Sequence, residues 1–248
     1  MSSSTSFLLA IEDLTVSFDG FKAVDGLNLY LEKDELRVII GPNGAGKTTV
    51  LDMICGKTRP TAGSIRFRNQ ELVGMAEHRI VRAGVGRKFQ TPSIYENLTV
   101  FENLELSYPK GRGVWGCLAF RRTAAVEERV RQVASEVYLS EQLSLEGAFL
   151  SHGQKQWLEI GMLLMQEPEL LMLDEPVAGM SPTERERTAD LLQRITRGRS
   201  IVIIEHDMEF VSRIAHKVTV LHLGKILAEG SMAEVQANPK VVEVYLGH

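Results

Sequence analysis

The chain lacks several features that mark common classes of protein. It has only two cysteines, Cys55 and Cys117, whose spacing fits no metal site and indicates a reducing compartment. It has no excess of positive charge: 28 Lys and Arg stand against 32 Asp and Glu, so the net charge of −4 gives no electrostatic case for binding nucleic acid. No uncharged apolar run reaches the roughly 18 residues that span a bilayer, and the Ser-rich start lacks the basic segment of a secretory signal. These absences predict a cytoplasmic protein that reaches a membrane only through its partners.

What is present is the composition of an ordinary globular protein. Its 248 residues, 44% of them hydrophobic, can bury one core as a single domain or as a domain with a subdomain. The patterning predicts a β-rich N-terminal layer, a mostly helical stretch over 91–167, and then the alternation of strands and helices that is typical of an α/β core. The expected strands are 8–18, 26–31, 38–40, 64–68, 170–173, 201–204 and 218–223. The expected helices are 48–55, 103–108, 124–138, 183–195 and 208–216.

Helix starts are marked at three places. Ser181 and Ser231 each precede a Glu by three residues, which is the pattern of a capping box, and Asp207 suits the cap of the helix that follows it. The Gly- and Arg-rich connector over 109–122 is interpreted as a solvated loop. The last residues, 241–248, are interpreted as a closing helix, with a partner contact as the alternative.

A phosphate-binding loop follows the short apolar run at 38–40. The chain fits the pattern G-x-x-x-x-G-K-[ST], in which glycines let backbone N–H groups approach phosphates without a Cβ in the way. The helix behind the loop adds its positive N-terminal end. Lys47 is expected to reach the β- and γ-phosphates, and the Thr48 hydroxyl is expected to bind Mg²⁺. The residues of the predicted ATP contact are Gly41, Pro42, Asn43, Gly44, Ala45, Gly46, Lys47, Thr48 and Thr49.

Two carboxylates end an apolar strand at 170–173. Asp174 has the position of the Mg²⁺-binding carboxylate of a phosphate-loop enzyme. Glu175 projects differently, so it is predicted to polarise the attacking water as a general base. The alternative is an ordinary polar strand end, which the phosphate loop upstream makes less attractive.

A second phosphate contact is predicted at 151–154. Ser151 and Gly153 open a helix, and a small hydroxyl residue with a glycine at a helix N-terminus makes an anion site; Gln154 follows directly. Few phosphate-loop proteins also carry a Ser-x-Gly-Gln sequence just upstream of an apolar strand that ends in Asp-Glu. In this combination the chain resembles the nucleotide-binding subunit of an ABC transporter, over nearly its whole length.

The resemblance implies a fold and a division of the chain. The fold would be α/β, the P-loop NTPase fold of ABC ATPases, with an N-terminal antiparallel β layer, a RecA-like core and a helical subdomain. All of 1–248 would form one ABC ATPase domain. Its catalytic core with the β layer would comprise 7–90 and 168–248, and its helical subdomain 91–167.

The resemblance also implies roles for single residues. Gln90 would be the glutamine of the loop between core and helical subdomain, where it contacts Mg²⁺ or the attacking water. Phe18 would stack on adenine, although a core aromatic is the plainer interpretation of an alternating strand. His206, two residues beyond the strand at 201–204, would donate a hydrogen bond to the γ-phosphate; a lone His is otherwise a surface or core residue.

In ABC proteins the Ser-x-Gly-Gln sequence binds the γ-phosphate of the ATP held by the opposite subunit. The implied assembly is therefore a dimer of two ATPases, identical or different, in which the loop at 178–181 crosses the interface. Where the family most often has Gly, this chain has His152, which is expected to face solvent. The cofactors would be ATP and Mg²⁺.

Within the family, the chain is similar to ATPases of branched-chain amino-acid-type importers. The sequence segments at 178–180, 205–208 and 242–247 carry this likeness. The segments at 36–41, 54–60 and 151–159 look most like the urea-importer subunit. The implied partners are membrane permeases and, indirectly, a periplasmic or extracellular solute-binding protein, with the chain at the inner face of the membrane. The predicted cargo is urea or a short amide, and the alternative is a branched-chain amino acid.

Two other classes remain. A non-transport ABC protein that acts on DNA or ribosomes usually carries tandem ATPase halves, long coiled coils or basic extensions, whereas this chain has one half and a net charge of −4. A regulator that binds nucleotide without hydrolysis is disfavoured because the full catalytic set is present: Lys47, Thr48, Gln90, Asp174, Glu175 and His206.

Overall fold

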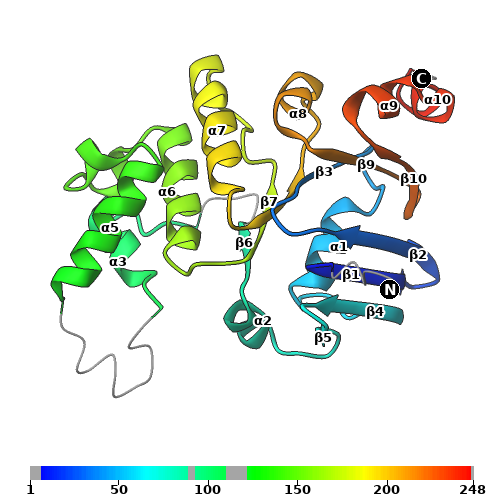
Figure 1. Cartoon of the computed structure of the whole chain (residues 1–248), viewed down its shortest axis with the longest axis horizontal. Helices are drawn as coiled ribbons and strands as arrows, with labels where there is room; N and C mark the ends of the chain where they lie inside the picture. Colours follow the sequence, from blue (N-terminus) through cyan, green and yellow to red (C-terminus); the bar gives the residue numbers. More distant parts are fainter. Residues whose placement is uncertain (1–6, 89–92, 110–121, 247–248) are drawn as a thin grey trace, which may run out of the picture.

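The computed structural model describes residues 7–88, 93–109 and 122–246, and in them two sheets lie beside a group of helices (Figure 1). The smaller sheet is antiparallel, in the order β2-β1-β4-β5. Its strands are β1 (Leu9–Phe18), β2 (Phe21–Leu31), β4 (Ala62–Phe67) and β5 (Gln70–Glu71). The larger sheet has the order β10-β9-β3-β8-β7-β6. Its strands are β3 (Leu36–Ile40), β6 (Val85–Lys88), β7 (Leu170–Asp174), β8 (Ser200–Ile204), β9 (Lys217–His222) and β10 (Lys225–Gly230).

The larger sheet is parallel except at its β10 edge. Every residue of β3, β7 and β8 is buried, which is the pattern of parallel strands covered on both faces. Because parallel strands present their carboxyl ends at one edge, the loops that follow β3, β7 and β8 meet there. The chain segments at 41–46, 175–181 and 205–207 are brought together in this way.

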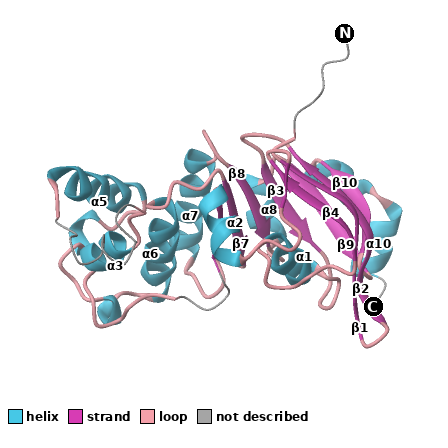
Figure 2. Ribbon diagram, turned by 90° about the horizontal axis from the view of Figure 1, so that it is seen from below, coloured by secondary structure: helices cyan, strands magenta, loops and turns pink. Residues whose placement is uncertain are grey.

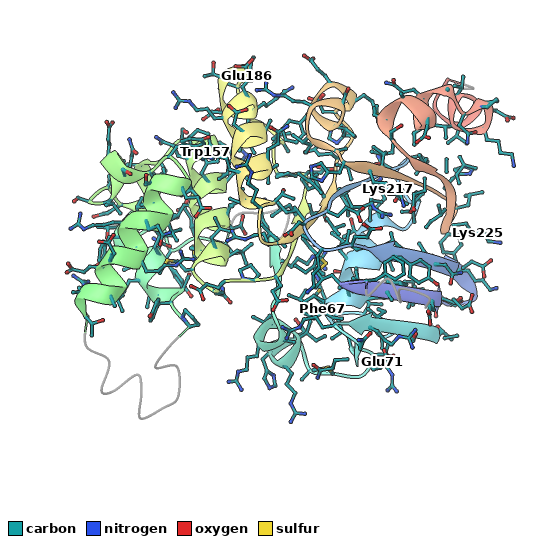
Figure 3. The ribbon with its side chains drawn as sticks, in the orientation of Figure 1. Phe67, Glu71, Trp157, Glu186, Lys217 and Lys225 are labelled. Carbon is teal, nitrogen blue, oxygen red and sulfur yellow. The ribbon has the colours of Figure 1, made fainter. Side chains whose placement is uncertain are left out.

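The helices of the described residues are α1 (Lys47–Ile54), α2 (Glu77–Ala83), α3 (Val100–Leu106), α5 (Ala124–Glu136), α6 (His152–Leu164), α7 (Pro182–Ile195), α8 (Met208–Ile214), α9 (Met232–Ala237) and α10 (Pro239–Leu246), with 3₁₀ turns at Ser140–Gln142 and Gly147–Phe149. Helices α3, α5 and α6 lie at one end of the elongated molecule and α9 and α10 at the other, with the remaining helices between them (Figures 1 and 2). Helices α3, α5 and α6 pack together at the end opposite the smaller sheet. Trp157 joins this group to α7, since its indole Nε1 donates to Thr188 Oγ1 at 2.9 Å (Figure 3).

Two hydrophobic clusters hold these layers. One lies between the larger sheet and the helices on its α7 and α8 side and continues into α3, α5 and α6. The other fills the space between the two sheets around α1, and Phe67 of β4 is buried in it (Figure 3). Because α1 follows the phosphate loop directly, this second cluster anchors the loop to both sheets.

The expected elements are present, and the predicted caps are confirmed. Ser181 and Ser231 form capping boxes with their following Glu residues, and Asp207 accepts from two backbone N–H groups at the start of α8. The structure differs at β2, which begins at Phe21 rather than at residue 26, and in β6, β10 and α2, which the patterning did not indicate. The start of β2 lies on an exposed hairpin with no alternation to reveal it, and β6 carries polar residues.

Among the described residues, no helix is long and apolar enough to cross a membrane. Cys55 is buried, whereas Cys117 and most of the connector at 109–122 lie outside the described residues. Helix α10 agrees with the predicted closing helix as far as residue 246, and residues 247–248 lie outside the described residues. The division at residues 90 and 167 stays a prediction, because a subdomain is defined by its relative movement.

Candidate active site

The glycine loop between β3 and α1 has a backbone that only glycine fits at two points. Gly46 has φ +98°, and a Cβ on it would lie 2.5 Å from the carbonyl oxygen of Ala23 in β2. A Cβ on Gly41 would lie 2.2 Å from the carbonyl oxygen of Leu221 in β9. The loop is therefore wedged between β2 and β9, and its N–H groups form the bare surface that a polyphosphate needs.

Lys47 folds back over this loop from the first position of α1. Its Nζ donates to the carbonyl oxygens of Gly41 at 2.7 Å and Pro42 at 3.0 Å. Burial lowers the pKa of Lys47, and attraction to Glu175 and Asp174 opposes that change. The ammonium group is thus held at the mouth of the loop, between the backbone cradle and the two carboxylates.

Thr48 and Asp174 form the pair of oxygen ligands expected for Mg²⁺. The Thr48 hydroxyl donates to Asp174 Oδ2 at 3.3 Å, and Asp174 is the buried last residue of β7. Burial raises the pKa of Asp174, while the hydrogen bond from Thr48 and the nearby Arg87 oppose the rise. A carboxylate and a hydroxyl fit a cation that takes few protein ligands and completes its shell with phosphate and water. The described residues accordingly contain no cluster of three or more His, Cys, Asp and Glu that could hold a metal alone.

Glu175 and His206 face each other at the same edge of the sheet. Glu175 Oε1 lies 3.6 Å from His206 Nδ1, and both side chains are reachable from solvent. Glu175 has φ +48°, so the chain turns sharply after β7 and sends Glu175 in a different direction from Asp174. The backbone N–H of His206 donates to the buried Glu205 at 3.1 Å, which fixes the start of the His206 loop.

Ser151, Gly153 and Gln154 lie together at the start of α6. Ser151 is the N-cap, and Gln154 Oε1 accepts from its backbone N–H at 2.9 Å, which closes a capping box. The Ser151 hydroxyl donates to Glu184 Oε1 at 3.1 Å. Helix α6 lies apart from α1, the helix that follows the glycine loop (Figures 1 and 2), so the two predicted phosphate contacts are separate within one subunit.

His152 is exposed, as predicted, but it also makes a contact that the sequence did not reveal. Its Nε2 lies 3.1 Å from the carbonyl oxygen of Ala178, in the loop that follows Glu175. The side chain therefore links the start of α6 to the 178–181 loop. A glycine at position 152, which has no side chain, could not make this contact.

Two predicted residues need separate mention. Gln90 lies outside the described residues, so its role stays a prediction. Phe18 ends β1 with 49% of its side chain exposed, and it pairs with Phe21, which is 65% exposed. Because Ala23 of the same hairpin touches Gly46, both rings lie on the hairpin beside the glycine loop, and Phe21 is a second candidate for contact with adenine that the sequence had not suggested.

Arg87 is a further residue that sequence reasoning missed. Its Nη1 donates to Asp52 of α1 at 2.6 Å, and its Nη2 lies 4.0 Å from Asp174 Oδ2. It therefore braces the helix behind the glycine loop against the strand that carries Asp174. A Gly-Arg-Lys sequence gives no sign of burial, and only the pairing of β6 with β7 places Arg87 here.

Comparison with known proteins agrees with this geometry. A family model described as "ABC transporter" matches residues 24–178, and one described as "Branched-chain amino acid ATP-binding cassette transporter" matches residues 225–248. The chain has the ABC ATPase fold: it superposes on a nucleotide-free ATP-binding cassette of an ABC transporter with a TM-score of 0.85 at 29% identity, covering 98% of this chain and 100% of the other. The ADP conformation of an ATP-binding cassette gives 0.85 at 30% identity, with coverage of 98% and 99%.

The chain belongs to the ABC transporter family and is an ABC ATPase. BraF of Pseudomonas aeruginosa, a high-affinity branched-chain amino acid transport ATP-binding protein, is 37% identical over 252 residues, which cover 97% of this chain and 98% of BraF. LivG of Escherichia coli, with the same description, is 35% identical over 249 residues, with coverage of 97% and 98%. More narrowly, the chain is an ATP-binding subunit of the branched-chain amino acid type.

Proposed function

We propose that this chain is the ATP-hydrolysing motor subunit of an importer, and that two ATPases close around two ATP molecules to drive it. The observation that carries the proposal is the meeting of four side chains at one edge of the sheet. Thr48 and Asp174 lie 3.3 Å apart, and Glu175 and His206 lie 3.6 Å apart, beside the glycine loop. A metal-binding pair and an acid–base pair next to a phosphate cradle are the parts that phosphoryl transfer to water needs.

Each residue has a distinct task. The loop N–H groups and Lys47 bind and orient the β- and γ-phosphates, and Thr48, Asp174 and Gln90 would hold Mg²⁺. When bound, Mg²⁺ would supply electrostatic neutralisation of the phosphate oxygens. Glu175 accepts a proton from the attacking water, and His206 donates a hydrogen bond to the γ-phosphate.

The separation of the two phosphate contacts supports a dimer. The start of α6 makes its hydrogen bonds within its own helix, to Glu184 of α7 and to the carbonyl oxygen of Ala178. In both views α6 lies apart from α1, the helix that follows the glycine loop (Figures 1 and 2). A second ATPase would supply the second phosphate contact, so ATP would hold the two subunits together until it is cleaved. The second subunit is a copy of this chain or a related ATPase.

The partners proposed are integral membrane permeases, linked to a solute-binding protein on the other side of the membrane. The net charge of −4 speaks against nucleic acid. Exposed aromatic side chains at the helical end, Tyr95 (57%) and Phe149 (72%), offer an apolar contact to a permease. The chain would thus work at the inner face of the membrane without entering it.

Two cargoes are proposed. Urea or a short amide is suggested by the likeness of the phrases at 36–41, 54–60 and 151–159 to urea-importer subunits. A branched-chain amino acid is the alternative, and the descriptions of the curated relatives favour it. No residue of the candidate site would contact the cargo, so the permeases and the solute-binding protein would determine which cargo is transported.

The proposal is tested by capturing partners with Glu175→Gln. This variant should keep ATP bound, so a tagged copy purified with Mg·ATP from native membranes should bring two multi-span permeases and a second ATPase. Recovery of ribosomes or DNA-bound proteins without permeases would overturn the transport role and leave the ATPase chemistry in place.

The cargo is tested by uptake in cells that lack this chain. Labelled urea and labelled leucine are supplied in parallel, and the gene is restored as wild type or as Glu175→Gln. Restoration of urea uptake by the wild type alone would support the urea assignment, and restoration of leucine uptake alone would support the alternative.

A further inference from the structure

A buried ion pair joins the larger sheet to the helical end of the molecule. Lys88 is the last residue of β6, at the edge of the sheet, and Glu159 lies in the middle of α6. Lys88 Nζ is 3.5 Å from Glu159 Oε2, and the two side chains are 0% and 7% exposed. Buried pairs of this kind are a poor source of stability, because removing two charges from water opposes their attraction. The presence of this buried pair is therefore better explained by the chain segments that it holds in place than by a contribution to stability.

Glu159 holds the chain on both sides of residues 89–92. Its Oε2 faces Lys88 on one side, and its Oε1 accepts from the backbone N–H of Ser93 at 3.3 Å on the other. One carboxylate of α6 therefore fixes the chain before and after the segment that contains Gln90. Movement of α6 along or away from the sheet must change at least one of these two contacts.

Lys88 also faces the candidate metal site. It pairs with Leu173 in the parallel β6–β7 ladder, so it lies beside the residue before Asp174. Asp174 and Glu205 attract its ammonium group in addition to Glu159. If Glu159 moves away with α6, the carboxylates of Asp174 and Glu205 still attract the ammonium group of Lys88.

The same helix carries the second phosphate contact at its start. Ser151 caps α6, and Glu159 lies eight residues further on, about 12 Å along the axis of a rigid helix. Because both residues belong to this helix, a rigid-body displacement of its start also displaces Glu159.

We propose that Glu159 and Lys88 form a positioning pair that couples the placement of α6 to the chain around Gln90 and to Asp174. This inference rests on the proposed function, since it assumes that nucleotide bound at the glycine loop is sensed by α6. Neither residue touches substrate: Glu159 acts through Lys88 and Ser93, and Lys88 acts through Asp174.

The test is hydrogen exchange on the full chain with and without the Mg²⁺ complex of the imido analogue of ATP. The key variant is Lys88→Met with Glu159→Met, since loss of both charges leaves no uncompensated ion and the chain should fold. In the wild type, the analogue should slow exchange in the glycine loop and in α6. In the double variant, protection of the loop and nucleotide affinity should be unchanged, and the response of α6 should fall about fivefold or more.

The matched control removes a neighbouring ion pair from the same helix. Lys155 of α6 pairs with Glu96 at 2.7 Å, and both side chains are more exposed than the buried pair of Glu159 and Lys88. The variant Lys155→Met with Glu96→Gln should keep the full response of α6. A merely structural role of the buried pair would lower the thermal midpoint and leave the ratio of the α6 response to the loop response unchanged.

Three results decide the outcome. Loss of the α6 response in the double variant, with loop protection intact, supports the coupling. An unchanged α6 response in that variant, or no α6 response in the wild type, overturns the coupling and leaves the ATPase role in place. Absence of protection at the glycine loop itself would overturn both, which separates failure of the proposed function from failure of this inference.

Discussion

Glu175 adopts a backbone conformation that few non-glycine residues take. Its φ of +48° costs on the order of 1 kcal/mol, and such strain persists only where the surroundings enforce it. Here the N–H of Glu175 donates to the carbonyl oxygen of Ile204 at 3.0 Å, which pins the turn to the end of β8. The strain has a chemical use, since it points Glu175 toward His206 and leaves Asp174 for the metal.

The first prediction concerns that carboxylate. Glu175→Gln keeps the shape of the side chain but removes the proton acceptor, so ATP turnover should fall by roughly 10²–10⁴-fold, the usual worth of a positioned acid–base group. Steady-state phosphate release in the assembled complex measures the rate, and equilibrium dialysis confirms that ATP is still bound. Wild-type turnover in this variant would remove Glu175 from the chemistry.

The second prediction concerns Lys47. Its ammonium group is held over the glycine loop by the carbonyl oxygens of Gly41 and Pro42, ready to meet the phosphates. Lys47→Ala should abolish measurable ATP binding in isothermal titration. Lys57→Ala removes a positive charge from the exposed surface near the end of the same helix and should bind ATP as the wild type does. Unchanged affinity in Lys47→Ala would refute its role.

The third prediction follows from the burial of Asp174, which raises the pKa of its carboxyl group. A carboxyl with a raised folded-state pKa stabilises the fold below its unfolded value, near 4, and that contribution is lost as pH rises through the folded value. Without Mg²⁺ and nucleotide, Asp174→Asn should therefore be the more stable chain at pH 8, by roughly 0.5–2 kcal/mol. The difference should shrink at pH 5.

Urea unfolding at the two pH values measures this difference. The other carboxyl groups with raised pKa, Glu159 and Glu205, are common to both chains and cancel in the comparison. The same variant should lose Mg²⁺-dependent turnover, because the carboxylate that costs stability is the one that the metal needs. If the Asp174→Asn chain is less stable than the wild type at pH 8, the prediction is wrong. The interactions of the Asp174 carboxylate with Thr48 and Arg87 then outweigh the cost of burying its charge.

At the scale of elements, local chemistry decides what a sequence can reveal. The glycine loop and the boxes at Ser181 and Ser231 were predictable because their residues act on backbone groups within a few positions. Strand β6 was not, since its buried Lys88 pairs with a carboxylate 71 positions away, that of Glu159. The contact of His152 with Ala178 is equally non-local.

For the site residues too, the sequence predicted the placements that follow from a general rule and missed the others. Proximity of Thr48, Asp174, Glu175 and His206 followed from the rule that parallel strands share a carboxyl edge. Arg87 and Phe21 followed from no such rule. Arg87 needs the pairing of β6 with β7, and Phe21 needs the approach of β2 to the glycine loop.

The fourth prediction belongs to α7. The Ser181 hydroxyl accepts from Glu184 N at 3.3 Å, and Ser181→Ala removes this cap, which should lower the free energy of unfolding by about 1 kcal/mol. Ser231→Ala, which removes the equivalent cap of α9, should cost about the same. Only the first variant borders the 178–181 loop, so only it should also reduce turnover in the complex. Loss of turnover in both would mean that the effect is one of stability.

At the scale of the whole molecule, a second exposed aromatic surface lies away from the candidate site. The carboxyl edge of the larger sheet carries the phosphate chemistry, whereas the helical end exposes the rings of Tyr95 and Phe149. Their segments touch, since the N–H of Ala148 donates to the carbonyl oxygen of Glu96 at 2.9 Å. Two aromatic side chains on one surface are the kind of anchor that dominates protein interfaces.

The last prediction is that these rings bind a permease. Tyr95→Ser with Phe149→Ser should leave ATP affinity unchanged and lower recovery of the permeases in the Glu175→Gln capture by about 30-fold, the equivalent of a 2 kcal/mol hot spot. The control is Val242→Ser, which removes an exposed apolar side chain from α10, at the opposite end of the molecule (Figure 1). Because this position is far from the two rings, the control should not change recovery of the permeases. Full recovery of the permeases with the double variant would place the docking surface elsewhere. An equal loss of recovery with Val242→Ser would mean that any loss of exposed apolar side chains weakens the interaction, wherever they lie.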